Sequence, residues 1–280
     1  MDATITKKTA PTWMIRGIIT LVIAASFWFV YRELDKNQVQ FGEAISSAGI
    51  ELWLGGAIIV AMMVIWPIIW MIMMRACGAK MHFRESCAIW WTTNIAKYVP
   101  GKVSLIAGRA WVARKWGAQV VVECFAWELI LSTSSALIAG CLLLTNSEIS
   151  LFWKIVLGVL ALFSLLPLIN LNFTQKILRK PIAMVGKGEW DEPVTMTRRY
   201  YLFVLSLMFV SWGIWGIAHK MILEGIGVDV SLSVLIAVFA ISWMAGFYAF
   251  FLPAGFGVRE GSLTYLLNIV VSGGVGAILA

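Results

Sequence analysis

A few ionisable residues stand inside long apolar stretches of this chain, and their types suit the binding of an anion. They are Lys97, Lys102, Arg109, Glu128, Arg259 and Glu260. Ionisable side chains at membrane depth are costly, and they usually face a cavity or a partner of opposite charge. Arginine presents a planar fork of donors that matches phosphate oxygens. The pattern indicates a site for an anionic headgroup, but ion pairs between Arg109 and Glu128 or between Arg259 and Glu260 would explain it structurally.

Two breaks in the apolar pattern accompany these charges. The first, "KYVPGK", contains Pro100 and Gly101, and the second, "LPAGFGVRE", contains Pro253, Gly255 and Gly257. Proline ends a helix because it lacks an amide hydrogen and clashes with the preceding turn. Glycine lets the backbone bend and can expose amides to an anion. We therefore expect both breaks to contribute to substrate binding.

The composition places the chain in a membrane. Of its 280 residues 60% are hydrophobic and 13% are charged, against about a quarter charged in soluble domains. Apolar runs long enough to cross a bilayer, or nearly so, cover residues 15–31, 52–74, 124–146, 155–173, 200–218, 230–258 and 261–280. This predicts an all-α integral membrane protein. We expect one polytopic domain over residues 1–280, a helical bundle of about seven to eight membrane segments with one or two re-entrant or broken hairpins.

Charge orients these segments. Lys7, Lys8 and Arg16 accompany the first run, the segment 32–51 is acidic, and the loop 174–199 is net basic. Cytoplasmic loops carry an excess of Lys and Arg. The pattern predicts a multi-pass protein of the inner (plasma) membrane, with its N-terminus and the loop 174–199 in the cytoplasm.

Residues 86–113 predict a re-entrant hairpin. The segment has two short apolar arms around Pro100, and basic residues flank it on both sides. If its first arm crossed the membrane fully, the basic residues after it would lie outside, against the excess of Lys and Arg in cytoplasmic loops. A re-entrant hairpin avoids this, because non-helical backbone is tolerated at membrane depth inside protein. Residues 240–280 are a possible repeat of this element, because Trp90 and Trp243 each precede a proline by ten residues. Three spans separate the two elements, so they would enter from opposite sides as an inverted repeat. Alternatively, the second element spans the membrane fully.

Two motifs carry a resemblance to a known family. "NIAKYVPGKV" with a downstream "AGR", and "LPAGFGVREG", resemble the lysylphosphatidylglycerol synthase transmembrane region family, in particular its flippase-like members without the soluble synthase domain. The matching positions are Asn94, Pro100, Gly108, Arg109, Pro253, Gly255, Gly257, Arg259 and Glu260. Ala254 stands where the family often has glycine, and the Glu-Arg pair common after the first hairpin is absent. The resemblance implies a lipid headgroup as ligand, with Asn94 among the residues that bind it.

Two classes of function remain open. The first is a lipid translocator for an anionic phospholipid or a polyprenyl-phosphate-linked lipid, working beside enzymes of envelope biosynthesis. The second is a membrane-embedded transferase, or the membrane subunit of one, which would need a general base such as Glu128 or Glu260 and a donor site. A scaffold for a separate synthase is a third possibility. Neither a metal site nor a cofactor is expected. The net charge of +7 reflects the basic cytoplasmic segments and their contact with anionic lipid, and it gives no reason to expect a nucleic-acid partner.

Overall fold

The computed structural model describes residues 46, 48–95, 103–145, 149–185, 196–249, 252–255 and 257–270. The chain divides into two compact units, Met1–Ser46 and Ser47–Ala280, and the description below concerns the second. The predicted first helix at residues 15–31 and the last part of the predicted segment 261–280 lie outside the described residues.

The described part of the chain is helical and contains no strand. Four helical stretches are long and apolar enough to cross a membrane. They are α3 (Ile50–Ala76), α6 (Ala118–Gly140) continued by η3 (Cys141–Thr145), α7 (Leu151–Ser164) continued by α8 (Leu166–Ile169), and α10 (Arg198–Gly225). The prediction of an all-α polytopic membrane protein is confirmed, and α3, α6 and α10 lie where apolar runs were predicted.

Small residues bring the central helices close together. A side chain at Gly55 of α3 would meet the Ala218 carbonyl of α10 at 2.5 Å, and one at Gly216 of α10 would overlap Ile236 of the next helix. Glycine at such contacts lets helix backbones approach, which is the usual basis of helix association in lipid. The contacts fix α10 between α3 and α11 (Leu232–Tyr248), and these three helices frame the cavity described below.

The first hairpin consists of α4 (Phe83–Asn94) and α5 (Val103–Val112). At 1.5 Å per residue its arms are about 18 and 15 Å long, half of what a bilayer requires. Lys115, just after α5, forms an ion pair with Glu85 in the first turn of α4, and this bond holds the pKa of Glu85 below its ordinary value. The chain thus returns to the end from which it left, as the re-entrant prediction requires.

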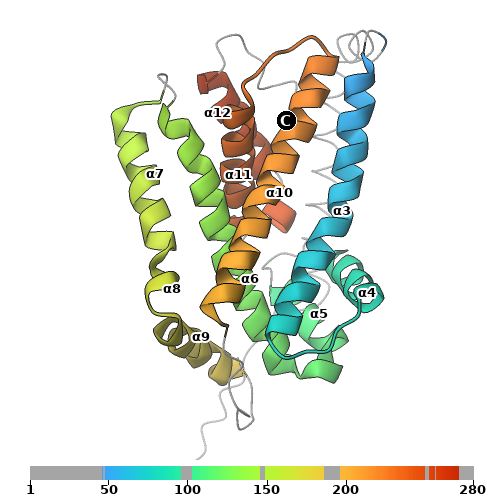
Figure 1. Ribbon diagram of the computed structural model, residues 1–280, viewed down its shortest axis with the longest axis vertical. Coiled ribbons are helices and arrows are strands. Elements are labelled where there is room, and N and C mark those ends of the chain that lie inside the picture. The colour runs from blue at the N-terminus through green and yellow to red at the C-terminus, as the bar shows by residue number, and fades with distance from the viewer. Residues whose placement is uncertain are drawn as a thin grey trace, which may run out of the picture. The chain divides into compact units, whose positions relative to one another are not determined.

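The second hairpin consists of α11, a break with the short η4 (Pro253–Gly255), and α12 (Val258–Val270). Leu263 and Leu267 of α12 share a buried cluster with Val230 and Leu235, so α12 folds back along α11. Figure 1 shows α4 and α5 at one end of the bundle and α12 at the other. α11 ends at Tyr248 and the chain turns at the break, as a hairpin requires. The depth to which this second element crosses the membrane stays a prediction.

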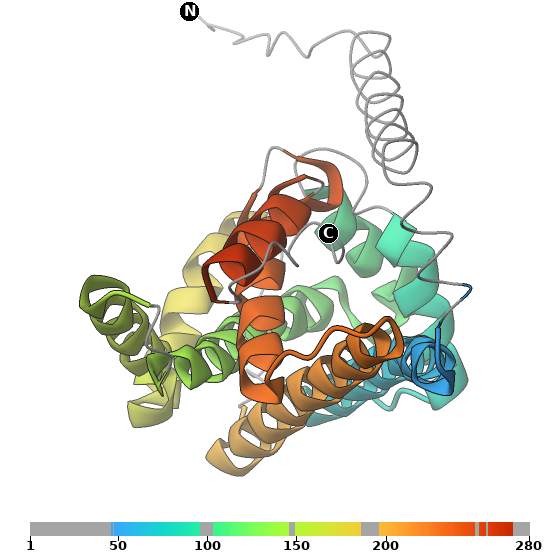
Figure 2. The same ribbon diagram turned by 90° about the horizontal axis from the view of Figure 1, so that it is seen from above.

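The helices in the region 155–199 begin and end at other residues than the apolar pattern indicated. The apolar run at 155–173 becomes α7 and α8, and α9 (Leu171–Val185) then occupies the first half of the predicted loop 174–199. Asn170 has non-helical backbone angles, with φ of −144° and ψ of 84°, and its Oδ1 accepts a hydrogen bond from the Phe173 amide at 2.9 Å. This side chain caps the new helix, as asparagine commonly does. Figures 1 and 2 show α9 running in a direction different from that of α7.

Candidate functional site

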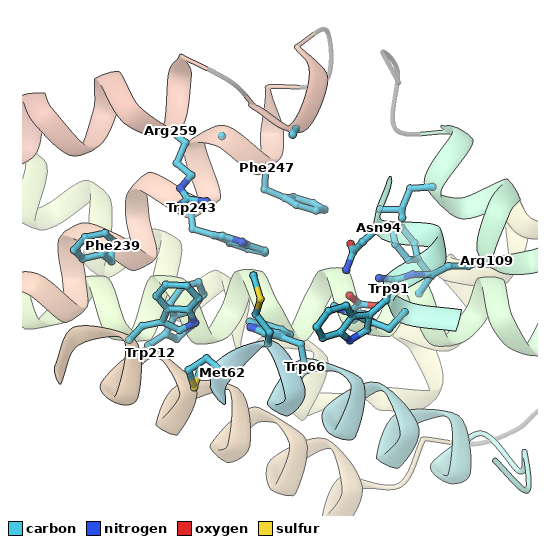
Figure 3. Close-up of a pocket in the computed structure, with 18 residues that line it drawn as sticks. Met62, Trp66, Trp91, Asn94, Arg109, Trp212, Phe239, Trp243, Phe247 and Arg259 are labelled. Atoms are coloured by element: carbon cyan, nitrogen blue, oxygen red, sulfur yellow. The ribbon is translucent and has the colours of Figure 1, made fainter. Parts of the chain in front are cut away.

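A cavity of about 450 Å³ lies between the two hairpins and helices α3, α6 and α10. Half of its described lining residues are aromatic, and its charged or amide side chains among them are Asn94, Arg109, Glu128 and Arg259. Figure 3 shows Arg109 and Arg259 on opposite sides, with Trp66 and Trp243 between them. Tertiary structure thus brings together predicted site residues from both hairpins and from α6.

Arg109 is engaged by the protein itself. Its side chain is 2% exposed, and its Nη1 donates to Oε2 of Glu128 at 2.5 Å. Its Cζ lies 4.1 Å from the ring centroid of Trp90, within cation–π range. The predicted structural pair of Arg109 and Glu128 is therefore present, and it links the first hairpin to α6 with its charges balanced.

Arg259 differs from Arg109 in both exposure and partners. It is exposed in the first turn of α12, at the cavity wall. The ion pairs among the described residues involve Arg109, Lys115 and Lys220, and none of them involves Arg259. The second predicted structural pair, Arg259 with Glu260, is therefore absent. Within the part described, Arg259 is the lining cation left without an anionic partner.

Glu260 and the glycines shape the break. Glu260 Oε2 accepts from the Gly257 amide at 2.8 Å, which caps α12, and the Gly255 amide donates to the Leu252 carbonyl at 3.2 Å. The amides expected to face a ligand are thus already bonded. Gly255 and Gly257 have φ of 74° and 81°, in the left-handed region that favours glycine. Neither these glycines nor Glu260 lines the cavity, so their contact with a ligand stays a prediction.

Ala254 is the non-glycine residue with positive φ among the described residues, at 52°. Left-handed backbone costs an L-residue roughly 1–2 kcal/mol. It is also the position at which this sequence departs from the glycine common in the family it resembles. Ala254 lines the cavity beside Gly246, which shows how closely the break approaches the site.

Four predicted site residues, Lys97, Pro100, Gly101 and Lys102, lie outside the described residues. Pro253 is described as the first residue of η4. Sequence reasoning missed most of the aromatic wall, because it used Trp90 and Trp243 only to compare the two hairpins. Both rings stack on Trp66 of α3, with centroids 6.2 and 6.4 Å away and interplanar angles of 9° and 12°. The high tryptophan content, 15 residues, was the signal that could have suggested such a wall.

The apolar spans and the two hairpins around an arginine-bearing cavity define a polytopic membrane protein with interrupted helices. The chain belongs to the lysylphosphatidylglycerol synthase TM region family, whose family model matches residues 14–280, in agreement with the resemblance of its motifs. Neither the curated proteins nor the solved structures contain a match. Family membership relates the protein's function to membrane lipids.

Proposed function

We propose that the protein translocates a lipid with an anionic headgroup, and that the headgroup passes through the cavity between the two hairpins. The observation that supports this most directly is Arg259, a lining cation on the second hairpin with no carboxylate partner among the described residues. An unpaired charge inside a membrane protein is costly and marks a substrate path by default.

The dimensions of the cavity suit this role. Ligand pockets commonly enclose about 300–1,000 Å³ with mostly apolar walls and a few polar groups, and this cavity of about 450 Å³ follows that pattern. A headgroup that crosses hydrocarbon unshielded loses its hydration, so a protein that shields it lowers the barrier. The acyl chains would remain in the lipid while the headgroup lies among the aromatic side chains.

The same geometry argues against a transferase. General acid–base chemistry needs a carboxylate that is free to take a proton. Among the described lining residues the carboxylate is Glu128, which already accepts from Arg109. Glu260, the other base considered, caps α12 outside the cavity wall. Enzymes that make or use the lipid would be separate partners, and envelope biosynthesis would supply them.

The distribution of charge supports an orientation. The end at which the first hairpin begins and ends carries Arg75, Lys80, Arg84, Arg114, Lys115, Arg198 and Arg199. By the positive-inside bias this end faces the cytoplasm of a plasma membrane. The first hairpin would then enter from the cytoplasm and the second from the opposite side, as in an inverted repeat.

Reconstitution tests the proposal. The protein is placed in liposomes with a fluorescent phosphatidylglycerol, and exchange between leaflets is followed with a membrane-impermeant quencher. We expect exchange by the wild type, strong loss in Arg259→Ala, and partial activity in Arg259→Lys, because an ammonium cannot reproduce the guanidinium fork. Arg199→Gln, which removes an exposed arginine at the start of α10, is the matched control and should retain exchange. A wild-type rate no faster than that of protein-free liposomes contradicts the proposal.

A further inference from the structure

A second cavity, of about 330 Å³, lies at the connection between α3 and α4, and it shares no lining residue with the central cavity. Its lining residues run from the last turn of α3 to the residue that caps α4: Arg75, Gly78, Ala79, Lys80, Met81 and His82. Figure 1 shows this connection at the end of the bundle that carries α4 and α5. The apolar run of α3 ends at Met74, so the cavity lies at the level of the lipid headgroups.

Two basic side chains of this cavity have donors open to a ligand. The Arg75 Nε donates to the Met81 carbonyl at 2.9 Å, which holds the guanidinium against the loop and leaves its two Nη atoms on the outside of this contact. None of the ion pairs in the described part of the chain involves Arg75 or Lys80, and both side chains are exposed. The cavity therefore carries two cations that have no anionic partner among the described residues.

His82 adds a third donor. Its ring accepts a hydrogen bond from the Glu85 amide, and Glu85 Oε2 accepts one from the His82 amide at 2.9 Å, so the two residues form a capping box at the start of α4. A neutral imidazole has one accepting and one donating nitrogen. Because the cap uses the accepting nitrogen, the other nitrogen carries the hydrogen. His82 is exposed, so this N–H can reach a ligand in the cavity.

The acceptors around the cavity are already engaged. The last carbonyls of α3, those of residues 73–75, accept from the amides of the loop at 2.9–3.0 Å. The carbonyls of Lys80 and Met81 accept from Trp116 Nε1 at 3.3 Å and from Arg75. Both oxygens of Glu85, the carboxylate nearest in the chain, are used by the ion pair and the cap described above. Donors thus outnumber free acceptors, and a phosphate supplies the oxygens that such donors need.

We propose that this cavity is a second anion site, which binds the phosphate group of a ligand through Arg75, Lys80 and His82. Arg75 supplies a guanidinium fork, Lys80 a point charge and His82 a neutral donor. Because Arg75 belongs to α3 and His82 caps α4, a bound phosphate ties the end of α3 to the start of the first hairpin. Lipid headgroups and soluble phosphate compounds both present this chemistry at the membrane surface. The site is independent of the proposed function, because none of its three residues lines the central cavity.

Hydrogen–deuterium exchange of the purified full chain in a non-ionic detergent tests the proposal, because it reports the opening of residues 77–85 directly. The probes are inorganic phosphate and dioctanoyl phosphatidic acid, and their counterparts without phosphate are chloride at matched ionic strength and dioctanoylglycerol. We expect phosphate to slow exchange in this segment severalfold, while both counterparts leave it unchanged. Protection by inorganic phosphate supports a site open to soluble ligands, and protection by the phosphatidic acid alone supports a headgroup site.

Three variants assign the protection to residues. Lys80→Gln removes the ammonium group and keeps the hydrogen bond to the Lys80 carbonyl, and Arg75→Gln removes the guanidinium. Each should raise the phosphate concentration needed for protection about tenfold, the effect of losing one charge-assisted hydrogen bond. Arg84→Gln is the matched control and should respond as the wild type does, because Arg84 is an exposed arginine in the first turn of α4 that does not line the cavity.

Three outcomes overturn the site. The first is absence of protection by both phosphate probes. The second is an equal loss in Lys80→Gln and Arg84→Gln, which would show general attraction to a basic surface. The third is a loss in Arg75→Gln with a wild-type response in Lys80→Gln, which would show that Arg75 only holds the loop. None of these outcomes affects lipid translocation through the central cavity, which the exchange assay tests separately.

Discussion

Two arginines that follow the prolines of the two hairpins have opposite surroundings. Arg109 is buried against Glu128 and the ring of Trp90, whereas Arg259 is exposed to the cavity and has no described carboxylate partner. A buried, paired arginine has its charge balanced and contributes to assembly, while an unpaired one at a cavity wall is available to a ligand. The same side chain therefore has a structural role in one hairpin and a proposed binding role in the other.

The Arg109–Glu128 pair can be tested as a structural unit. Glu128→Leu leaves a buried guanidinium without its partner, and breaking a buried pair in this way costs about 3–5 kcal/mol in unfolding free energy. The double variant Arg109→Met/Glu128→Leu removes both charges and should recover most of that loss. Denaturation in detergent micelles measures these two variants and the single variant Arg109→Met. A double variant as unstable as the sum of the two single variants would contradict this account.

The glycines of the second break offer a matched pair of substitutions. A methyl group at Gly255 would overlap the Gly246 carbonyl of α11, whereas one at Gly257 meets no atom within 4 Å. Both positions have positive φ, so each alanine costs roughly 1–2 kcal/mol in backbone strain, and Gly255→Ala carries the overlap in addition. We expect Gly255→Ala to accumulate poorly and to melt well below Gly257→Ala. Equal melting temperatures would show that α11 can move away from the break.

At the scale of elements, α3 holds the two hairpins together through a single ring. Trp66 stacks with Trp90 from α4 on one side and with Trp243 from α11 on the other. Pro67 follows it inside α3, and the Pro67 carbonyl accepts a hydrogen bond from Ser86 of α4 at 2.6 Å. This part of α3 therefore fixes the position of the first hairpin and supports the second.

Removal of this ring should affect both hairpins at once. Large-to-small substitution of a packed aromatic residue typically costs about 3–5 kcal/mol, so Trp66→Ala should lower stability strongly and weaken binding of phosphatidylglycerol. Trp53→Ala is the control on the same helix, because Trp53 is 63% exposed. Thermal unfolding in detergent measures the difference. If Trp66→Ala melts like Trp53→Ala, the ring does not support the hairpins.

At the scale of the whole molecule, the topology can be checked by labelling. Single cysteines at Lys80 and Lys115, introduced without the four native cysteines, should both react with an impermeant reagent from the cytoplasmic side, since the two positions flank the first hairpin. A cysteine at Asp229, between α10 and α11, should react from the opposite side. Reaction of the Lys80 and Lys115 positions from different sides would contradict the re-entrant hairpin, and a reversal of all three would contradict only the orientation.

The class of protein and the existence of the breaks can be predicted from the residues alone. Long apolar runs predict a helical membrane bundle, because in lipid the backbone amides of each segment must form hydrogen bonds within that segment. Proline and glycine at the second motif marked the end of α11, since those residue types limit the local backbone directly. Basic residues on both sides of residues 86–113 indicated a hairpin, because charge bias reports the side on which a segment ends. These inferences depend on local chemistry, which the sequence contains in full.

The difference in partners between the charged residues depends on contacts made in the folded chain. Whether Arg109 or Arg259 has a partner depends on which side chains from α6 and α12 approach them, and such contacts between distant segments have no local signature. The aromatic stack on Trp66 likewise joins α3, α4 and α11, and spacing within any one of them does not reveal it. The adjacent residues Arg259 and Glu260 suggested an ion pair, but neighbouring positions on a helix do not face each other. Glu260 turns to the Gly257 amide, and Arg259 lies at the cavity wall.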